Sequence, residues 1–420
     1  MSQRMHRRYM RVLLAWILVL VALVAAGNWL MDPFGLFGSP DWQGFNRVKP
    51  EIVKNDRPAK AQMIERQRPT ALILGNSRSL NGIPTDHRAW NGQAVFNGAF
   101  TAGYLGEALE VLKFAHDGGR LKRVLLNIDE LNYRAGGDLS SRYDPRRYRR
   151  DFTGTWVRAL DRAQALTTDY GLRASYRTWK ARHGNLMESD AAIILPDGSV
   201  DQDLFFSAIA RRGGAREAFA RVERQAHLST PRRSLPGDTK PYSNYSLAEA
   251  TLLELLRFCR KEGIEISIFL PPAHVRSLAE KKLSNSLDVM LQIRRSVLDS
   301  VRREAIESEQ PRAPVFDFLQ INNFTEEAIP PFGDEAHRMT WFFEGSHFTQ
   351  HFGEIILSVV YSSDTTADPQ KAPIATALSE ETISTSWRAL QSDLRRWMES
   401  NPDEIADLRK VQLNPTTHAN

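Results

Sequence analysis

An uncharged run of apolar residues near the amino terminus restricts where this chain can fold more than any other feature of its sequence. The run extends from Val12 to Leu30, and the first acidic residue after it is Asp32. Nineteen uncharged residues are enough for one α-helix to cross the hydrocarbon core of a bilayer, and Trp29 suits the interface beyond it. The sequence therefore predicts one transmembrane anchor at residues 12–30.

Basic residues on one side of this run predict the orientation of the anchor. Five of them precede it: Arg4, His6, Arg7, Arg8 and Arg11. Because the cytoplasmic flanks of membrane spans are rich in arginine and lysine, residues 1–11 are expected in the cytoplasm. The anchor would then be a single pass in the inner (cytoplasmic) membrane, and the rest of the chain would be extracytoplasmic, in the periplasm. A cleaved signal peptide stays open as the alternative, since Val24-Ala25-Ala26 has the small residues that a signal peptidase needs.

Beyond residue 66, apolar strands and amphipathic helices alternate along the chain. Five short apolar runs that end at glycine, proline or polar residues are predicted to be strands: 71–74, 94–98, 124–129, 264–270 and 315–318. Helical spacing and end signals predict helices at 105–116, 246–261, 287–307 and 352–361, with one further helix before this region at 51–67 and one after it at 386–399. This alternation is typical of parallel βαβ units. The expected fold is therefore α/β, with a doubly wound, mostly parallel sheet and flanking helices.

The same patterns predict how the chain is organised into segments. These are a cytoplasmic basic segment (1–11), the anchor (12–30), a stalk (31–65), an α/β domain (66–362) with an insertion at about 134–245, and a polar carboxyl-terminal extension (363–420). A capping box formed by Ser246 and Glu249 is expected to start the helix that follows the insertion.

The insertion contains a cluster of arginines and tyrosines. Its members are Arg142, Tyr143, Arg146, Arg147, Tyr148, Arg149 and Arg150. Such a cluster can bind an anionic polymer through charge and through aromatic faces. A solvated basic surface that binds nothing specific is the other interpretation, and the sequence leaves both open.

Charge and cysteine content narrow the classes of function. Lysine and arginine number 55 against 50 aspartate and glutamate, and this net charge of +5 is spread along 420 residues, so no nucleic-acid partner is predicted. The single cysteine, Cys259, falls within an apolar helical pattern, which predicts a buried structural thiol and excludes an internal disulfide. No motif predicts a cofactor.

A serine follows the first predicted strand after a glycine and an asparagine. The apolar run 71–74 continues directly into Gly75-Asn76-Ser77-Arg78. A glycine permits a sharp turn, which can leave the following hydroxyl exposed at the carboxyl edge of a parallel sheet. Ser77 is therefore a candidate nucleophile, although glycine, asparagine and serine are also common in turns for conformational reasons alone.

An acid and a base stand together near the end of the predicted domain. They are Glu344 and His347, three residues apart in Glu344-Gly345-Ser346-His347. A serine hydroxyl becomes a good nucleophile when a neutral imidazole accepts its proton, and a carboxylate fixes the tautomer of that imidazole. Ser77, His347 and Glu344 are thus the expected nucleophile, base and orienting acid of a catalytic triad.

In these two stretches the sequence resembles the SGNH (GDSL-type) hydrolases, in which a serine near the amino end of the domain acts with an Asp-x-x-His pair near its carboxyl end. The resemblance implies an oxyanion hole in which the backbone N–H groups of Ser77 and Gly98, next to Asn97, hold the charge of a tetrahedral intermediate. The family's Gly-x-Asn-Asp block has no clean match here. Asn127 and Asp129 lie nearest to it and are the candidates for a third donor or a substrate contact.

The layout is most similar to a membrane-anchored, extracytoplasmic branch found with polysaccharide O-acetylation and other cell-envelope acyl-transfer systems. Shared features are the anchor, Gly-x-Ser-Arg after a strand, a Pro-Pro-Ala-His turn at 271–274, and Glu-x-Ser-His-Phe before Gly353. The resemblance implies a serine esterase or O-acyltransferase that acts on acyl groups, with acetyl expected, of an envelope or exported polysaccharide. It also implies a multi-span membrane protein as the acyl donor. Arg78 would contact the substrate or fix the turn Gly75-Asn76-Ser77 (the serine turn). His274 would line the cleft or close a loop.

Two other classes of function stay open at this point. Glu344, His347 and His351 would share one face of a helix and could bind a metal ion, although Gly345-Ser346 favours a loop. A catalytically inactive glycan-binding or assembly protein could also use the expected fold, because a fold does not determine a function.

Overall fold

The structure, a computed structural model, describes residues 3–116, 119–134, 137–182, 193–229, 245–361 and 374–413. The chain forms two compact units, each made of separate stretches of sequence. Unit 1 consists of Met1–Gln67 and Asp144–Pro196, and unit 2 consists of Arg68–Tyr143 and Asp197–Asn420. The predicted boundaries of stalk, insertion and extension stay predictions.

Unit 2 is built on a six-stranded sheet whose order is β2-β1-β3-β4-β5-β8. The strands are β1 (Ala71–Leu74), β2 (Val95–Asn97), β3 (Arg123–Asn127), β4 (Glu265–Leu270), β5 (Val315–Asp317) and β8 (Thr376–Ala377). β1 to β5 pair in parallel, and β8 is an antiparallel edge strand on β5. All of β1 and β2 is buried, which explains why these strands appear in the sequence as continuous apolar runs and not as an alternating pattern.

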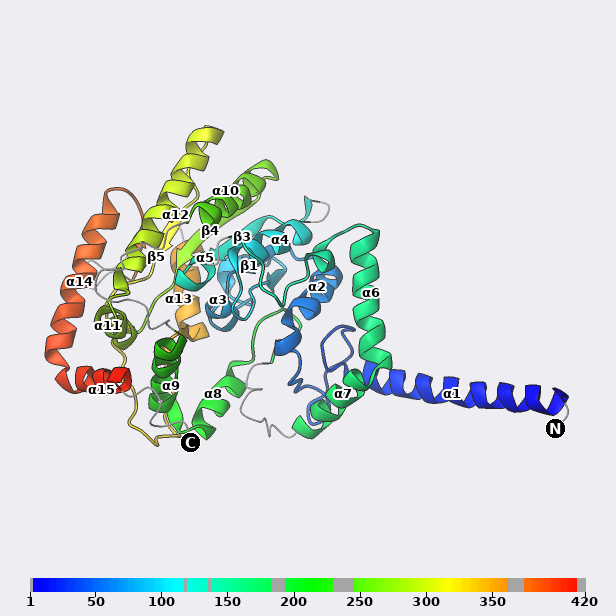
Figure 1. Ribbon diagram of the computed structural model, residues 1–420. Coiled ribbons are helices and arrows are strands. Elements are labelled where there is room, and N and C mark those ends of the chain that lie inside the picture. Colours follow the sequence, from blue (N-terminus) through cyan, green and yellow to red (C-terminus); the bar gives the residue numbers. More distant parts are fainter. Residues whose placement is uncertain are drawn as a thin grey trace. The chain divides into compact units, whose positions relative to one another are not determined.

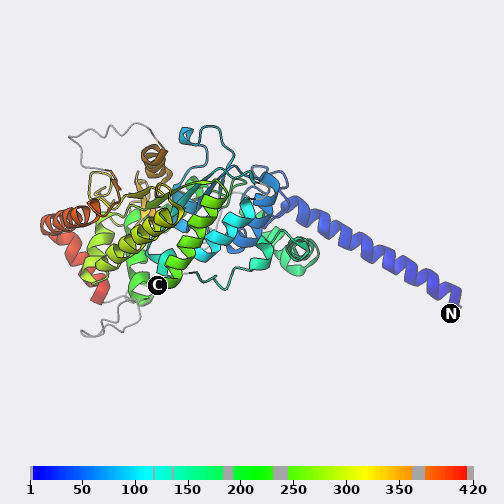
Figure 2. The same cartoon turned by 90° about the horizontal axis from the view of Figure 1, so that it is seen from above.

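Helices cover both faces of this sheet. Those of unit 2 are α3 (Ser77–Gly82), α4 (Leu105–Ala115), α5 (Glu130–Arg134), α8 (Gln202–Arg211), α9 (Gly214–Ser229), α10 (Ser246–Lys261), α11 (Val275–Leu283), α12 (Leu287–Ser308), α13 (Gln350–Tyr361), α14 (Thr382–Ser400), α15 (Pro402–Leu413) and the 3-10 turn η2 (Arg88–Trp90). Figures 1 and 2 show α4, α10 and α12 over one face and α13 over the other. Ile73, Leu125 and Phe269 of the sheet share a core with Phe352 and Ile356 of α13.

The expected capping box at the start of α10 is not formed. The helix begins at Ser246 after Tyr245, with no side-chain cap. Glu249 instead accepts a hydrogen bond of 2.5 Å from the Ser296 Oγ of α12. Tertiary packing between α10 and α12 therefore takes the carboxylate that a local capping rule would assign to the helix end.

The strand order creates a topological switch point between β1 and β3. The connection that leaves β1 leads to β2 on one side, and the next one returns to β3 on the other side. Loops after the carboxyl ends of two such strands diverge, and ligands of open α/β sheets bind in the crevice between them. The residues that follow Leu74 and Asn127 are therefore well positioned for a site.

Unit 1 contains helices and 3-10 turns in its described part. They are α1 (Gln3–Met31), η1 (Val53–Asn55), α2 (Asp56–Gln67), η4 (Pro145–Tyr148), α6 (Phe152–Thr167) and α7 (Asp169–Ala181). The most apolar 18-residue window of α1 is not buried, which is consistent with a signal anchor or a signal sequence. The predicted fold class is confirmed: an α/β fold with a mixed, mostly parallel sheet, flanking helices and an amino-terminal apolar helix.

Candidate active site

The turn after β1 requires glycine at its first position. Gly75 has a φ of +142°, and a Cβ built on it would lie 2.7 Å from the Cβ of Asn127. Asn76 then caps α3, because its side-chain oxygen accepts a hydrogen bond of 3.1 Å from the Arg78 N–H. Ser77 is consequently the first residue of α3, partly exposed beyond the carboxyl end of β1.

The expected acid and base lie on a small hairpin between β5 and α13. Its strands are β6 (Phe342–Glu344) and β7 (His347–Phe348), and they pair Glu344 with His347 across a two-residue turn. The Ser346 N–H donates to the Glu344 Oε2 at 2.7 Å, and the Ser277 Oγ of α11 donates to the Gly345 carbonyl at 2.9 Å. One hydrogen bond within the hairpin and one from α11 therefore hold the turn.

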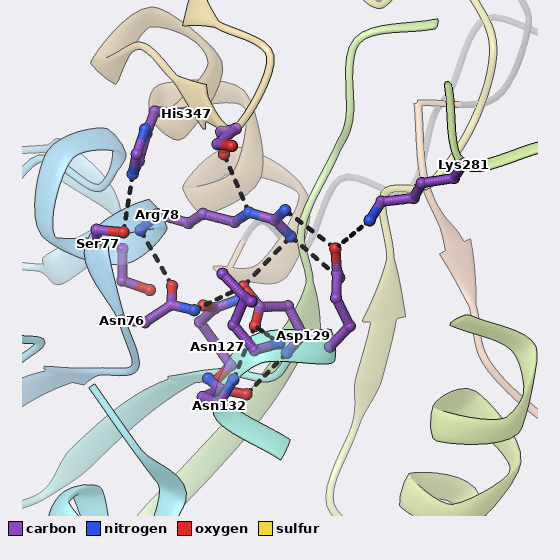
Figure 3. A network of polar contacts seen from close by, with 12 residues as sticks. Asn76, Ser77, Arg78, Asn127, Asp129, Asn132, Lys281 and His347 are labelled. Carbon is purple, nitrogen blue, oxygen red and sulfur yellow. Dashed lines mark hydrogen bonds and ion pairs between the residues drawn. The ribbon is translucent and has the colours of Figure 1, made fainter. Parts of the chain in front are cut away.

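The hairpin and the serine turn meet although 270 residues separate them. The Oγ of Ser77 lies 2.8 Å from the Nε2 of His347, and the Nδ1 of His347 is hydrogen-bonded to the Glu344 carboxylate. The contact between Ser77 and His347 is drawn in Figure 3. The His347 side chain remains 21 % exposed. All three residues of the expected triad are thus brought together in the order nucleophile, base, acid.

Close packing of α3 against the hairpin and α13 positions these groups. A Cβ on Gly82 of α3 would lie 2.2 Å from the Phe348 ring, and a Cβ on Gly353 of α13 would lie 1.8 Å from the Gly82 carbonyl oxygen. Larger residues at either position would push the two elements apart. The approach of His347 to Ser77 therefore depends on glycines outside the triad.

Arg78 ties the serine turn both to the hairpin and to the end of β3. Its Nε donates to the Ser346 carbonyl at 3.0 Å, and its guanidinium lies 3.2 Å from Asp129 and 3.4 Å from Glu130. Lys281 of α11 lies 2.9 Å from Glu130 and completes the network shown in Figure 3. Of the two roles expected for Arg78, the contacts support the one that fixes the turn.

Burial and charge act in opposite directions on this network. Burial alone would lower the pKa of Arg78, but Glu130 and Asp129 outweigh it and raise that pKa. Burial would likewise raise the pKa of Glu130, but Lys281 and Arg78 hold it well below its usual range. Arg78 and Glu130 therefore both stay ionised.

Asp129 and Asn132 stiffen the end of β3. The Asp129 Oδ1 accepts from the N–H groups of Leu131 and Asn132, and its Oδ2 accepts from the Asn76 side chain at 2.7 Å. The Asn132 side chain donates in turn to the Asn127 carbonyl at 2.8 Å. Asp129 thus accepts hydrogen bonds from the two turns at the switch point, and these contacts give it a positioning role.

Gly98 and Asn97, two residues expected at the oxyanion hole, make other hydrogen bonds in the structure. The Gly98 N–H is not free for an oxyanion, because it donates to the Ile73 carbonyl at 2.8 Å as part of the pairing between β1 and β2. Asn97 is fully buried and its amide donates to the Ser79 carbonyl at 3.0 Å, so it supports α3 and does not reach the site. Both differ from the expectation, since strand pairing and helix capping take these groups.

Asn127 behaves differently from these two residues. Its side-chain Oδ1 and Nδ2 are buried and have no hydrogen-bond partner within the part of the chain that the structure describes. It lies against Gly75 at the switch point and next to Asn76 in Figure 3. A buried amide without a hydrogen-bond partner lowers the stability of the fold. Its position beside the serine turn therefore makes the Asn127 side chain a candidate for a functional role.

His274 and His351 lie outside the site. His274 is buried, its Nδ1 accepts from the Arg276 N–H, and its Nε2 lies 2.8 Å from the Glu327 carbonyl. It closes a loop and caps α11, and burial lowers its pKa to about 4. His351 is an exposed residue of α13, whereas His347 has both ring nitrogens engaged; the described ranges contain no group of three residues suited to a metal ion.

In the arginine and tyrosine cluster, two arginines form ion pairs with nearby aspartates and both tyrosines are buried. Arg146 pairs with Asp144 at 2.8 Å, and Arg147 pairs with Asp161 at 2.7 Å. The rings of Tyr143 and Tyr148 are buried. These contacts favour a structural role for the cluster, and binding of an anionic polymer stays an untested prediction.

One residue beside the triad was not predicted from the sequence. Phe205 of α8 is half-buried, and its ring lies edge-on to that of His347 with centroids 6.3 Å apart and to that of Phe343 at 4.6 Å. An aromatic side chain beside a base is a feature that ligand pockets commonly have. Residues 202–211 carry no motif that points to this position.

The comparisons with known proteins add no relative: no family model, no curated protein and no solved structure matches this chain.

Proposed function

We propose that the protein is an extracytoplasmic serine esterase or O-acyltransferase. Its substrates would be the acyl groups of an envelope or exported polysaccharide, and acetyl is the acyl group we expect. The observation that carries the proposal is the 2.8 Å contact of the Ser77 Oγ with the His347 Nε2, together with the bond of the His347 Nδ1 to Glu344. The two contacts give one imidazole both a proton to accept and a carboxylate to orient it.

The chemistry follows from these contacts. As the Ser77 Oγ attacks the acyl carbonyl carbon, the His347 Nε2 accepts the hydroxyl proton, and Glu344 stabilises the imidazolium. Collapse of the tetrahedral intermediate breaks the ester bond, and the alcohol leaves with the proton from Nε2. Water or a sugar hydroxyl then attacks the acyl-serine by the reverse sequence, which gives hydrolysis or transfer.

Two groups are proposed to hold the negative charge of the intermediate. The Ser77 N–H is at the first position of α3, where helix geometry provides no intrahelical acceptor. The Asn127 amide has a buried donor without a partner among the described residues. Donors of this kind typically contribute about 10²–10³-fold to the rate each.

The substrate class rests on exposure and on the amino-terminal helix. Ser77 and His347 are both partly exposed, which suits an acyl group carried on a large polymer. Phe205 offers an apolar surface to a methyl group or a sugar ring beside His347. An α1 that spans the membrane would hold the domain near a multi-span acyl donor, the partner we propose.

The test compares Ser77→Ala with Ser79→Ala in the full chain. The assay offers a simple acetyl ester as donor and a glycan as acceptor as well as water. Ser77→Ala is expected to lower kcat by about 10³-fold or more, because the nucleophile is lost. Ser79→Ala is the matched control, since the Ser79 Oγ is buried and faces the Leu74 carbonyl, 3.5 Å away.

Normal turnover by Ser77→Ala would overturn the proposal. If the unaltered protein bound the glycan but turned over no donor, a binding or assembly function would replace the enzymatic one.

A further inference from the structure

Helix α6 in unit 1 exposes an apolar face that carries no charge. Phe152, Trp156 and Leu160 recur at four-residue spacing on it and are 82 %, 61 % and 45 % exposed. The other exposed residues of this helix are also uncharged: Thr153, Thr155, Ala163, Gln164 and Thr167. A helix face without charge is poorly suited to water, so this one needs a partner.

Helix α7 exposes apolar and basic residues in alternation. Leu172, Tyr176 and Trp179 share one side of the helix and are 51 %, 57 % and 44 % exposed. Arg173, Arg177 and Lys180 are exposed beside them; Arg173 also pairs with the exposed Asp169 at 3.3 Å, and Arg177 pairs with Glu51. The Lys180 Nζ lies 5.6 Å from the centre of the Tyr176 ring, and Arg182 lies 3.9 Å over Trp179. Aromatic rings mixed with basic groups suit the boundary between acyl chains and anionic headgroups.

Both helices are fixed to the end of α1. The Asn28 side chain donates to the Leu166 carbonyl of α6 at 2.9 Å and accepts from the Ser175 Oγ of α7 at 2.7 Å. Asn28 is buried, whereas Trp29 beside it is exposed. Figure 1 shows α6 running across the carboxyl end of α1. The apolar faces are therefore held at the point where α1 would leave a bilayer.

We infer that the exposed faces of α6 and α7 form a membrane-docking surface that inserts into the headgroup region of the bilayer that α1 spans. Continuity with α1 and the basic groups beside Tyr176 and Trp179 of α7 favour anionic phospholipid as the occupant, because basic groups next to interfacial aromatic rings suit anionic headgroups. The inference rests on an uncleaved α1 and is independent of the acyl chemistry at Ser77. It gives unit 1 a fixed orientation at the surface of the bilayer.

The experiment uses the full chain in vesicles of phosphatidylethanolamine and phosphatidylglycerol. Leu160→Cys and Leu172→Cys are labelled with an environment-sensitive fluorophore, and Asp299→Cys, whose parent side chain on α12 is 71 % exposed, is the control. Burial raises the pKa of Cys259 to about 12, so the native thiol stays unlabelled.

The labels at 160 and 172 are expected to shift to the blue and to lose about half or more of their emission to lipids that carry a nitroxide near the headgroup, whereas the label at 299 stays unchanged. Exchange of phosphatidylglycerol for phosphatidylcholine should reduce quenching at 172 more than at 160, because only α7 exposes basic residues. Thermal unfolding of each labelled variant confirms that it folds.

Labels at 160 and 172 that stay as accessible to aqueous iodide as the label at 299 would overturn the inference. Protection that develops only when native membrane proteins are added would overturn it too, and would assign the surface to a protein. Loss of acyl transfer in Ser77→Ala leaves all these outcomes unchanged, so the two proposals fail separately.

Discussion

Arg78 connects three parts of unit 2 through one side chain. It belongs to α3, its Nε donates to the Ser346 carbonyl in the hairpin, and its guanidinium pairs with Asp129 and Glu130 beyond β3. The planar fork of arginine is what permits these directions at once. The distance between Ser77 and His347 therefore depends on a residue that touches neither the reacting hydroxyl nor the imidazole.

Arg78→Lys is expected to lower kcat by roughly 10–100-fold with little change in KM. The reason is that one ammonium cannot reach Ser346, Asp129 and Glu130 together, so the hairpin shifts relative to α3. Steady-state kinetics and thermal unfolding measure the effect. Arg146→Lys is the control, because Arg146 is exposed and its ion pair at 2.8 Å is with Asp144, two residues away in the chain. A rise in KM with kcat unchanged would instead make Arg78 a substrate contact.

Asn127 permits a test in which activity and stability move apart. Asn127→Ala removes a buried amide that has no partner among the described residues, so the free energy of unfolding in urea should stay the same or rise. The same change should lower kcat by about 10²-fold if the amide stabilises an oxyanion. Asn127→Asp should be worse for activity, since a carboxylate would repel the developing charge. Lower stability with normal kcat would give Asn127 a structural role.

The triad residues could be predicted because their chemistry requires definite residue types at a definite spacing. Ser77 follows a strand and a glycine, and Glu344 precedes His347 by three residues. The oxyanion donors could not be predicted in the same way. Whether the Gly98 N–H is free depends on the pairing of β2 with β1, which is a contact between strands and leaves no signal in one sequence.

Helix α11 begins in a way that the sequence pattern does not reveal. The turn of Pro271 and Pro272 ends β4, but the sequence has no serine, threonine, aspartate or asparagine to cap the helix α11 that follows. His274 caps it, with the Nδ1 accepting from the Arg276 N–H, and its ring packs edge-on against Phe219 and Phe342. A neutral histidine thus replaces the serine or aspartate that usually starts a helix.

Stability should fall with acid in a way that depends on His274. The unfolded chain binds a proton at this residue below pH 6.5, whereas burial lowers the folded pKa to about 4. Between these values only the unfolded state is protonated, so the free energy of unfolding decreases as pH falls, by roughly 3 kcal/mol in full. His274→Asn can still cap α11 but does not titrate there. Urea unfolding from pH 7 to pH 4 should give a shallower slope for this variant, and parallel slopes for the two proteins would contradict the prediction.

The sequence predicts the five parallel strands of the sheet but neither their order nor the strands β6, β7 and β8. The run 71–74 matches β1, the runs 94–98, 264–270 and 315–318 contain β2, β4 and β5, and the run 124–129 overlaps β3. The neighbours of β1 are set by crossover packing, which no local pattern encodes. β8 is the clearest case, because this two-residue strand lies in the segment 363–420 that the sequence predicts to be a polar extension, and it pairs with β5.

The apolar helix α1 and its basic flank predict an extracytoplasmic position for the rest of the chain. Protease added to intact spheroplasts should digest the chain beyond residue 66, since the arginines before Val12 favour the cytoplasmic side. An uncleaved anchor leaves the protein in the membrane after an alkaline wash, with Val12–Leu30 detected by mass spectrometry. A cleaved signal peptide leaves a chain that starts after Ala26. Two arginines at Val19 and Leu20 supply the control, because each costs about 2.5–3.5 kcal/mol at the centre of a span and should prevent insertion. If the domain is protected from protease in spheroplasts but digested after lysis, it lies in the cytoplasm. It could then not act on an extracytoplasmic polysaccharide, which would contradict the proposed function.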